Sequence, residues 1–166
     1  MKRSLLYLSL TLLCFLGCSK EDVEVPENTA NLQGNSQKAE SEIAATLTAI
    51  FTAIDQKDGE TLISYHAYGP AFTEFQNGQH RTGSAENEAA EAALLDMISS
   101  FDYDLNDLQI DVLSGTVAKV TFHADFRPTI GGEEFQQLAQ ATLIFVKQKG
   151  EWKIIHEHLS PLGPVI

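Results

Sequence analysis

Apolar residues follow a helical spacing in the first half of the chain. From Ile43 to Ile54 they recur every three or four positions, as on one face of an α-helix. Ser41 is a suitable N-cap for this helix, and Asp58 and Gly59 end it. A second short helix is predicted over residues 60–66, and a third begins at Ser84. The predicted buried positions of the third helix are Leu94, Leu95, Ile98 and Phe101.

The apolar period changes to two in the second half, which is typical of half-buried strands. Phe122 and Phe126, for example, alternate with polar residues. Four strands are predicted from this alternation and from the turn signals between them. They cover residues 108–112, 120–127, 133–147 and 151–160.

An additional strand is predicted over residues 71–75, and it is followed by Asn77 and Gly78, a strong signal for a two-residue hairpin turn. Helices followed by an antiparallel meander indicate the α+β class, with N-terminal helices packed on one face of a curved sheet. The predicted domain covers residues 41–166.

The first 17 residues have the pattern of a secretory signal peptide. Lys2 and Arg3 precede an apolar run over residues 5–16, which is too short to span a bilayer as a helix. Gly17 and Cys18 resemble the end of a bacterial lipobox, which implies acylation of Cys18 and a lipid-anchored protein of the bacterial cell envelope. We expect the outer membrane, on its periplasmic side or at the cell surface. More than one acyl chain is needed for a stable anchor.

Residues 18–40 are polar and acidic, and we predict that they form a disordered tether. The two cysteines, Cys14 and Cys18, precede the predicted domain, so it has no disulfide and no thiolate metal site. Loss of residues 1–17 removes two positive charges and no acid, which changes the net charge from −12 to −14. Such a surface repels phosphate backbones, so no nucleic-acid partner is expected.

The last predicted strand, GEWKIIHEHLS over residues 150–160, carries a resemblance to a known family. Together with the order of elements over residues 41–164, it resembles the SnoaL-like domains of the nuclear transport factor 2-like superfamily, which has a cystatin-like fold. The branch that contains the calcium/calmodulin-dependent kinase II association domain is the most similar. The resemblance implies a cone in which helices and a bent sheet enclose a pocket. It also implies a homodimer that pairs through the sheet.

Candidate site residues follow from this resemblance and from strand geometry. Side chains two apart on a regular strand share a face, so Trp152, His156 and His158 are predicted to face the pocket together. A pocket arginine of the kinase branch falls at His123 here, and Arg127 is the nearby replacement. The ligand-binding candidates are Tyr65, His66, Tyr103, Arg127, Trp152, His156 and His158.

Three functions are compatible with these residues. A pocket that binds a small organic ligand is the first prediction. An isomerase, cyclase or dehydratase that uses His123, Asp125 and His158 in acid–base catalysis is the second, and a dimeric interaction scaffold is the third. The histidines could also be structural, and residues 121–127 could present a solvated face. Because an isolated His-x-His pair seldom completes a metal site, no metal and no cofactor are predicted.

Overall fold

The computed structural model describes residues 27–163 of the chain, and it confirms the α+β class. Three helices and seven strands occur in this part. The helices are α1 (Glu27–Asp55), α2 (Gly59–Ser64) and α3 (Gly83–Met97). The strands are β1 (Thr73–Gln76), β2 (Gln79–Thr82), β3 (Ile98–Ser114), β4 (Val117–Ile130), β5 (Glu133–Glu134), β6 (Gln137–Gln148) and β7 (Glu151–Pro161).

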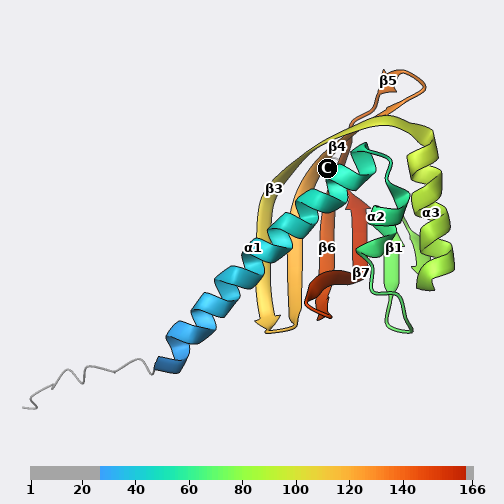
Figure 1. The fold of residues 1–166 in the computed structure, drawn as a ribbon. Coiled ribbons are helices and arrows are strands. Elements are labelled where there is room, and N and C mark those ends of the chain that lie inside the picture. The colour runs from blue at the N-terminus through green and yellow to red at the C-terminus, as the bar shows by residue number, and fades with distance from the viewer. Residues whose placement is uncertain (1–26, 164–166) are drawn as a thin grey trace, which may run out of the picture.

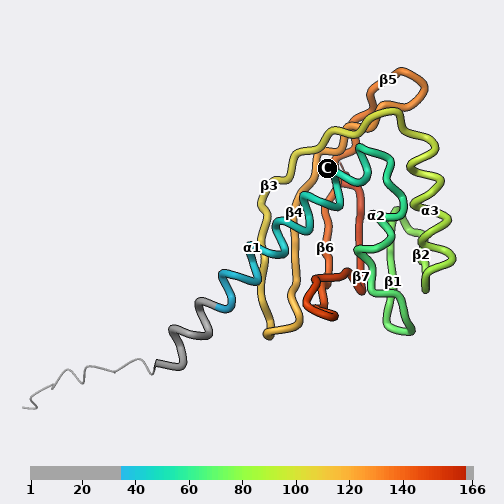
Figure 2. The backbone as a smooth tube through the Cα atoms, viewed as in Figure 1, coloured from blue at the N-terminus to red at the C-terminus, as the bar shows by residue number. Residues whose placement is uncertain are grey.

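The strands form one sheet in the order β2-β1-β7-β6-β4-β3, and β5 pairs with the end of β4. Every neighbouring pair is antiparallel except β1 and β7, which run parallel. Figure 1 shows α1 crossing one face of the curved sheet, with α2 and α3 on the side of β1 and β7. The same path of the chain can be followed as a tube in Figure 2. The helices thus cover one face of the sheet, as predicted.

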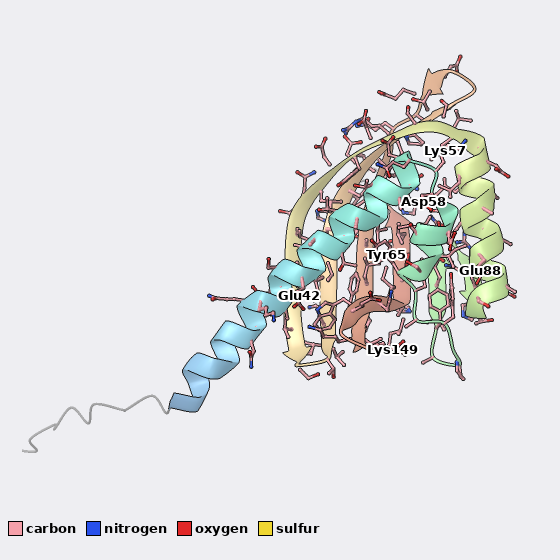
Figure 3. The ribbon with its side chains drawn as sticks, in the orientation of Figure 1. Glu42, Lys57, Asp58, Tyr65, Glu88 and Lys149 are labelled. Atoms are coloured by element: carbon pink, nitrogen blue, oxygen red, sulfur yellow. The ribbon has the colours of Figure 1, made fainter. Side chains whose placement is uncertain are left out.

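The main core lies between α1 and the sheet. Ile43 and Leu47 of α1 are buried against sheet residues such as Val120 and Phe145. Between α1 and α2, Lys57 adopts a left-handed backbone conformation with φ of 58°. Asp58 then caps α2, because its carboxylate accepts a hydrogen bond of 3.0 Å from the backbone N–H of Thr61. Figure 3 labels Lys57 and Asp58.

Two predicted element boundaries are wrong. α1 begins at Glu27 and not at Ser41, and Ala39 is already buried, so the helix includes residues predicted as tether. The third helix ends at Met97, because Ile98 and Phe101 belong to β3. Both residues are buried as predicted, but residues 101–106 alternate between apolar and polar and pair with β4. The predicted signal peptide, Cys18 and residues 19–26 lie outside the described residues.

A β-bulge in β7 overturns the predicted orientation of the last strand. Ile154 pairs with Phe145 and His156 pairs with Ile144, so Ile155 is one extra residue on β7. An extra residue exchanges the faces of the side chains that follow it. Before the bulge Trp152 and Ile154 are buried, whereas after it Glu157 and not His156 lies on the inner side.

No helix within residues 27–163 combines the length and the apolar character that crossing a membrane requires.

Candidate functional site

A cavity of about 440 Å³ lies between the helices and the inner face of the sheet. Most of its wall is apolar and comes from α1, α2, α3 and the sheet strands. Typical lining residues are Leu47, Phe51, Leu62, Leu94, Phe122, Phe126 and Leu143. One end of the cavity is polar, so the space suits a molecule with an apolar body and one polar end.

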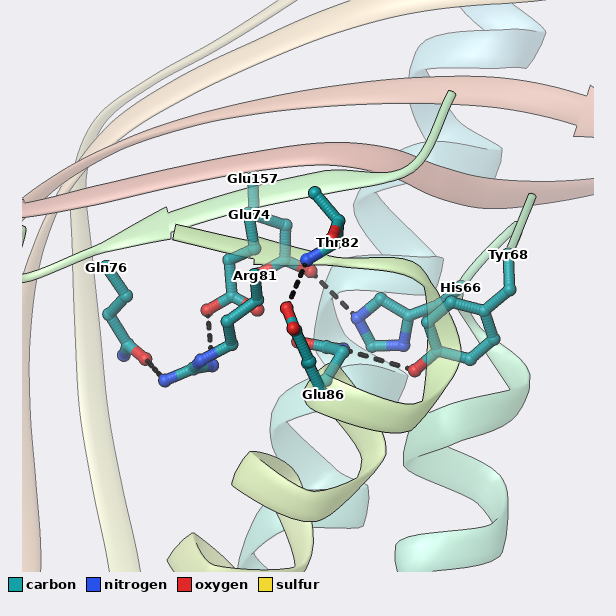
Figure 4. A network of polar contacts seen from close by, with 9 residues as sticks. His66, Tyr68, Glu74, Gln76, Arg81, Thr82, Glu86 and Glu157 are labelled. Atoms are coloured by element: carbon teal, nitrogen blue, oxygen red, sulfur yellow. Dashed lines mark hydrogen bonds and ion pairs between the residues drawn. The ribbon is translucent and has the colours of Figure 1, made fainter. Parts of the chain in front are cut away.

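Five ionisable side chains form this polar end: His66, Glu74, Arg81, Glu91 and Glu157. Strand pairing sets three of them in a row, because Arg81 pairs with Glu74 across β1 and β2, and Glu74 pairs with Glu157 across β1 and β7. Figure 4 shows His66, Glu74, Arg81 and Glu157 converging from separate segments. Glu91 extends from α3 on the opposite wall.

Arg81 holds one edge of the polar end. Its Nη1 donates to Oε1 of Glu74 at 2.7 Å, and its Nη2 donates to Oε1 of Gln76 at 2.8 Å. The side chain of Glu74 is only 3% exposed, and its Oε2 has no hydrogen-bond partner among the described residues. Burial raises the pKa of Glu74, and the charge of Glu157 adds to this effect, while Arg81 opposes it.

His66 and Glu157 form a second pair, in which the imidazole Nε2 donates to the carboxylate at 2.9 Å. Their side chains are 2% and 13% exposed. Burial of His66 favours its neutral form, but the hydrogen bond and the charge of Glu157 outweigh burial and raise the pKa of His66. Tyr68 stacks on the His66 ring at 5.4 Å between centroids, and burial raises the pKa of Tyr68 to about 12.

Glu91 differs from the other two carboxylates because none of the side-chain hydrogen bonds and ion pairs within the described residues includes it. Burial and the charge of Glu157 raise the pKa of Glu91 to about 7. A carboxyl group that titrates near neutral pH can either accept or donate a proton under physiological conditions. Glu91 therefore brings acid–base capacity to the cavity.

Most of the predicted ligand-binding residues lie elsewhere. His66 lines the cavity, as expected from its place after the second helix. Tyr103 stacks on Phe51 in the core at 4.3 Å, and Tyr65 packs against the core beneath Lys153. Trp152 is buried under α1, where its Nε1 donates to Glu42 at 2.9 Å.

The remaining predicted residues lie on the outer face of the sheet. Nδ1 of His156 is 2.8 Å from the hydroxyl of Thr73, and His123 pairs with Asp107 at 2.9 Å. Arg127 bridges Asp104 and Asp125 at 2.9 Å and 3.0 Å.

His123 and His158 do share a hollow, but it is a separate one of about 460 Å³ on this outer face. The predicted roles of His123, Asp125 and His158 in acid–base catalysis, and those of Arg127 and His156 in ligand binding, stay predictions. Within residues 27–163, no group of three or more His, Cys, Asp or Glu side chains is arranged to hold a metal ion.

Sequence reasoning did not identify Glu74, Arg81, Glu91 and Glu157 as site residues. Glu157 lies on the inner face because of the bulge at Ile155, which has no signature in the apolar pattern. Arg81 becomes a site residue because pairing with Glu74 draws its side chain inward. Phe72 and Glu74 are both buried, two positions apart. This spacing does not indicate a buried Glu74 in advance, because a lone acid on a short strand normally faces water.

Comparison with known proteins supports the fold and the family. The sequence profile of the SnoaL-like domain matches residues 43–164 of this chain. No curated protein sequence matches the chain significantly.

Solved structures share the fold along most of the chain. A proposed dehydratase of the nuclear transport factor 2-like family from Streptomyces avermitilis is 24% identical, with a TM-score of 0.70 over 76% of this chain and 98% of that one. A proposed scytalone dehydratase from Novosphingobium aromaticivorans is 15% identical, with a TM-score of 0.72 over 79% and 89%. A proposed calcium/calmodulin-dependent protein kinase II association domain from Xanthomonas campestris is 20% identical, with a TM-score of 0.67 over 75% and 88%.

Proposed function

This chain belongs to the SnoaL-like family, and from that premise we propose that its cavity binds a small organic molecule. The observation that carries the proposal is the division of the cavity into an apolar wall and one charged end. At about 440 Å³, the cavity falls within the usual range of small-molecule sites, which is roughly 300–1,000 Å³. The apolar wall supplies binding energy through the hydrophobic effect, and the charged end fixes orientation.

A neutral naphthyl alcohol, 2-(naphthalen-2-yl)ethanol, is a suitable first probe, with binding measured by titration calorimetry. We expect a 1:1 complex with the wild-type protein. Ala90 lines the cavity from α3, so Ala90→Phe fills the space and abolishes binding. Ala89→Phe places the same ring on an exposed position of the same helix and preserves binding. Equal binding by both variants contradicts the assignment of the cavity.

A second candidate function is acid–base catalysis of the dehydratase or isomerase type. Glu91 favours it, because a carboxyl group with a pKa of about 7 in an apolar cavity can remove a proton from carbon next to a carbonyl group. The relatives described as proposed dehydratases agree with this chemistry.

Deuterium exchange tests this candidate without knowledge of the natural substrate. 2-Tetralone in D₂O exchanges the protons next to its carbonyl slowly, and NMR follows the exchange. We expect the wild-type protein to accelerate exchange near pD 7 and Glu91→Gln to remove the acceleration. Glu88→Gln, on the same helix but outside the cavity lining, is the matched control. Exchange that is unchanged by Glu91→Gln rejects Glu91 as the base.

Lipid anchoring at Cys18 and a place in the bacterial cell envelope are also part of the proposal. The basic start, the short apolar run and the Gly17-Cys18 pair support it. Metabolic labelling with a palmitate analogue in a bacterial host, followed by fractionation of membranes, tests it. Cys18→Ala is expected to abolish labelling and to release the protein from the membrane fraction, while Cys14→Ala retains both.

We further propose that the outer face of the sheet mediates a homodimer, as the scaffold function requires. Leu138 and Phe75 are large apolar side chains that are 46% and 41% exposed. Sedimentation equilibrium is expected to show a dimer for the wild-type protein and a monomer for Leu138→Glu. A wild-type monomer at micromolar concentration contradicts this part of the proposal.

A further inference from the structure

The polar end of the cavity holds more negative than positive groups. Three carboxylates, Glu74, Glu91 and Glu157, stand against the two basic groups of Arg81 and His66 in the lining of the described cavity. With all five groups ionised, the end carries one net negative charge, and it carries two when His66 is neutral. The basic groups are therefore too few to neutralise the acidic ones.

Each basic group already donates to a polar partner, although Nδ1 of His66 has no partner among the described residues. Arg81 donates to Oε1 of Glu74 and to Gln76, and His66 donates to Glu157. Oε2 of Glu74 consequently receives no donor from the described chain, although its side chain is 97% buried. A buried carboxylate oxygen without a donor is costly. Because Glu74 lines the cavity, a ligand that carries an N–H group would relieve this cost.

We propose that the cavity selects a ligand whose polar end is a protonated amine or an amidinium group, with Glu74 and Glu91 as its recognition residues. This inference rests on the proposed function, because it assigns a chemical class to the ligand of the same cavity. An ammonium group carries three donors and one positive charge. It supplies the donor that Oε2 of Glu74 lacks, and it cancels the excess charge through charge-assisted hydrogen bonds.

A carboxylate ligand is disfavoured by the same contacts. It adds a further negative charge beside three acids, and Arg81, the one arginine in this lining, already donates to Glu74 and Gln76. A neutral alcohol can donate one hydrogen bond, but it supplies no positive charge to stabilise the ionised form of Glu91. The net charge of −12 on the whole chain also attracts cations toward the protein.

Amine binding has a proton signature. The pKa of Glu91 is raised to about 7 by burial and by the nearby charges of Glu157 and Glu74, while His66 and Arg81 act in the opposite direction. A bound ammonium group stabilises the ionised form of Glu91 and lowers that pKa. At a pH below this pKa, binding of the amine therefore releases a fraction of a proton into the buffer.

Three probes with one carbon skeleton test the inference: 2-(naphthalen-2-yl)ethylamine, the corresponding ethanol and naphthalen-2-ylacetate. Calorimetry at pH 6.5, in phosphate and in ACES buffer, which differ in ionisation enthalpy and contain no simple organic cation, measures affinity and proton release together. We expect the amine to bind at least tenfold more tightly than the alcohol, and the acetate to bind more weakly than the alcohol. We also expect proton release with the amine alone. Glu91→Gln is expected to remove the proton release and most of the preference for the amine, whereas Glu88→Gln leaves both unchanged.

The outcomes separate this inference from the proposed function. If the alcohol or the acetate binds as tightly as the amine and Ala90→Phe blocks that binding, the preference for cations is overturned and the small-molecule function stands. If none of the three probes binds, both fall. Tighter amine binding without proton release overturns the role of Glu91, and circular dichroism of Glu91→Gln confirms that the variant is folded.

Discussion

Glu74 and Glu157 occupy paired positions on the parallel strands β1 and β7, and each is held by a different base, Arg81 and His66 respectively. Two carboxylates side by side in a buried setting repel one another, so each requires its own partner. Glu91, on the facing helix, lies in the field of both and has no such partner among the described residues. The acid–base behaviour of the cavity is therefore concentrated on Glu91.

The stability of the protein should depend on pH through Glu91. Its pKa rises from 4.5 to about 7 on folding, so its contribution to the free energy of unfolding is complete below pH 4.5 and is lost as pH rises through 7. After allowance for partial exposure, we expect a loss of roughly 2 kcal/mol between pH 5 and pH 8. Urea unfolding at intervals of one pH unit measures it.

Glu91→Gln should flatten this part of the profile and should be more stable than the wild type at pH 8. His66 contributes a slope of the same sign, because its pKa is also raised, so some decline from pH 6.5 upward is retained in the variant. Glu88→Gln is expected to reproduce the wild-type profile. Parallel profiles for the wild type and Glu91→Gln would show that Glu91 titrates as an ordinary exposed acid.

Replacement of His158 should leave ligand affinity unchanged, because the bulge at Ile155 places its ring on the outer face. We expect His158→Ala to bind the naphthyl amine within about twofold of the wild-type affinity. Glu91→Gln, in contrast, should lose about tenfold, equivalent to about 1.4 kcal/mol. Calorimetric titration of both variants under one set of conditions decides between the two faces, and a loss confined to His158→Ala would relocate the site to the outer hollow.

Two hairpin turns of the same backbone type offer a reciprocal stability test. Asn77-Gly78 and Lys149-Gly150 each have two residues with positive φ, of 52° and 79° in the first and 52° and 90° in the second. Asparagine tolerates this conformation better than lysine, so Lys149→Asn should stabilise the protein by about 0.5–1 kcal/mol and Asn77→Lys should destabilise it similarly. Thermal unfolding measures both changes, and shifts of the same sign would refute the conformational argument. Lys149 is labelled in Figure 3.

The sequence pattern predicted the class and most elements of the fold because burial imposes periodicity. The α1 stripe from Ile43 to Ile54 and the alternation of Phe122 and Phe126 each follow from packing against one core. The boundary at Ile98 was missed, since an apolar residue at the junction satisfies both the helical and the strand pattern.

The site was much less predictable than the fold. His66 was identified, but the bulge at Ile155 reversed the faces on which His156, Glu157 and His158 lie. A single inserted residue moves every later side chain to the other face of the strand. The hydrophobic pattern fits the strand with or without the insertion, so the pattern does not reveal it. Glu74 and Arg81 become site residues only through pairing between β1, β2 and β7, and no local feature of their short strands indicates this pairing.

The parallel pairing of β1 with β7 has a consequence for biosynthesis. His66 and Glu157, which are 91 positions apart, meet only when the final strand is present. A chain that emerges N-terminus first, during synthesis or export, can form local elements such as the β1–β2 hairpin, but it cannot assemble the charged end until the final strand has emerged. Until then Glu74 is hydrated, and its ionised form has no desolvation penalty. The ability to bind a ligand therefore appears in one late step, when β7 pairs with β1.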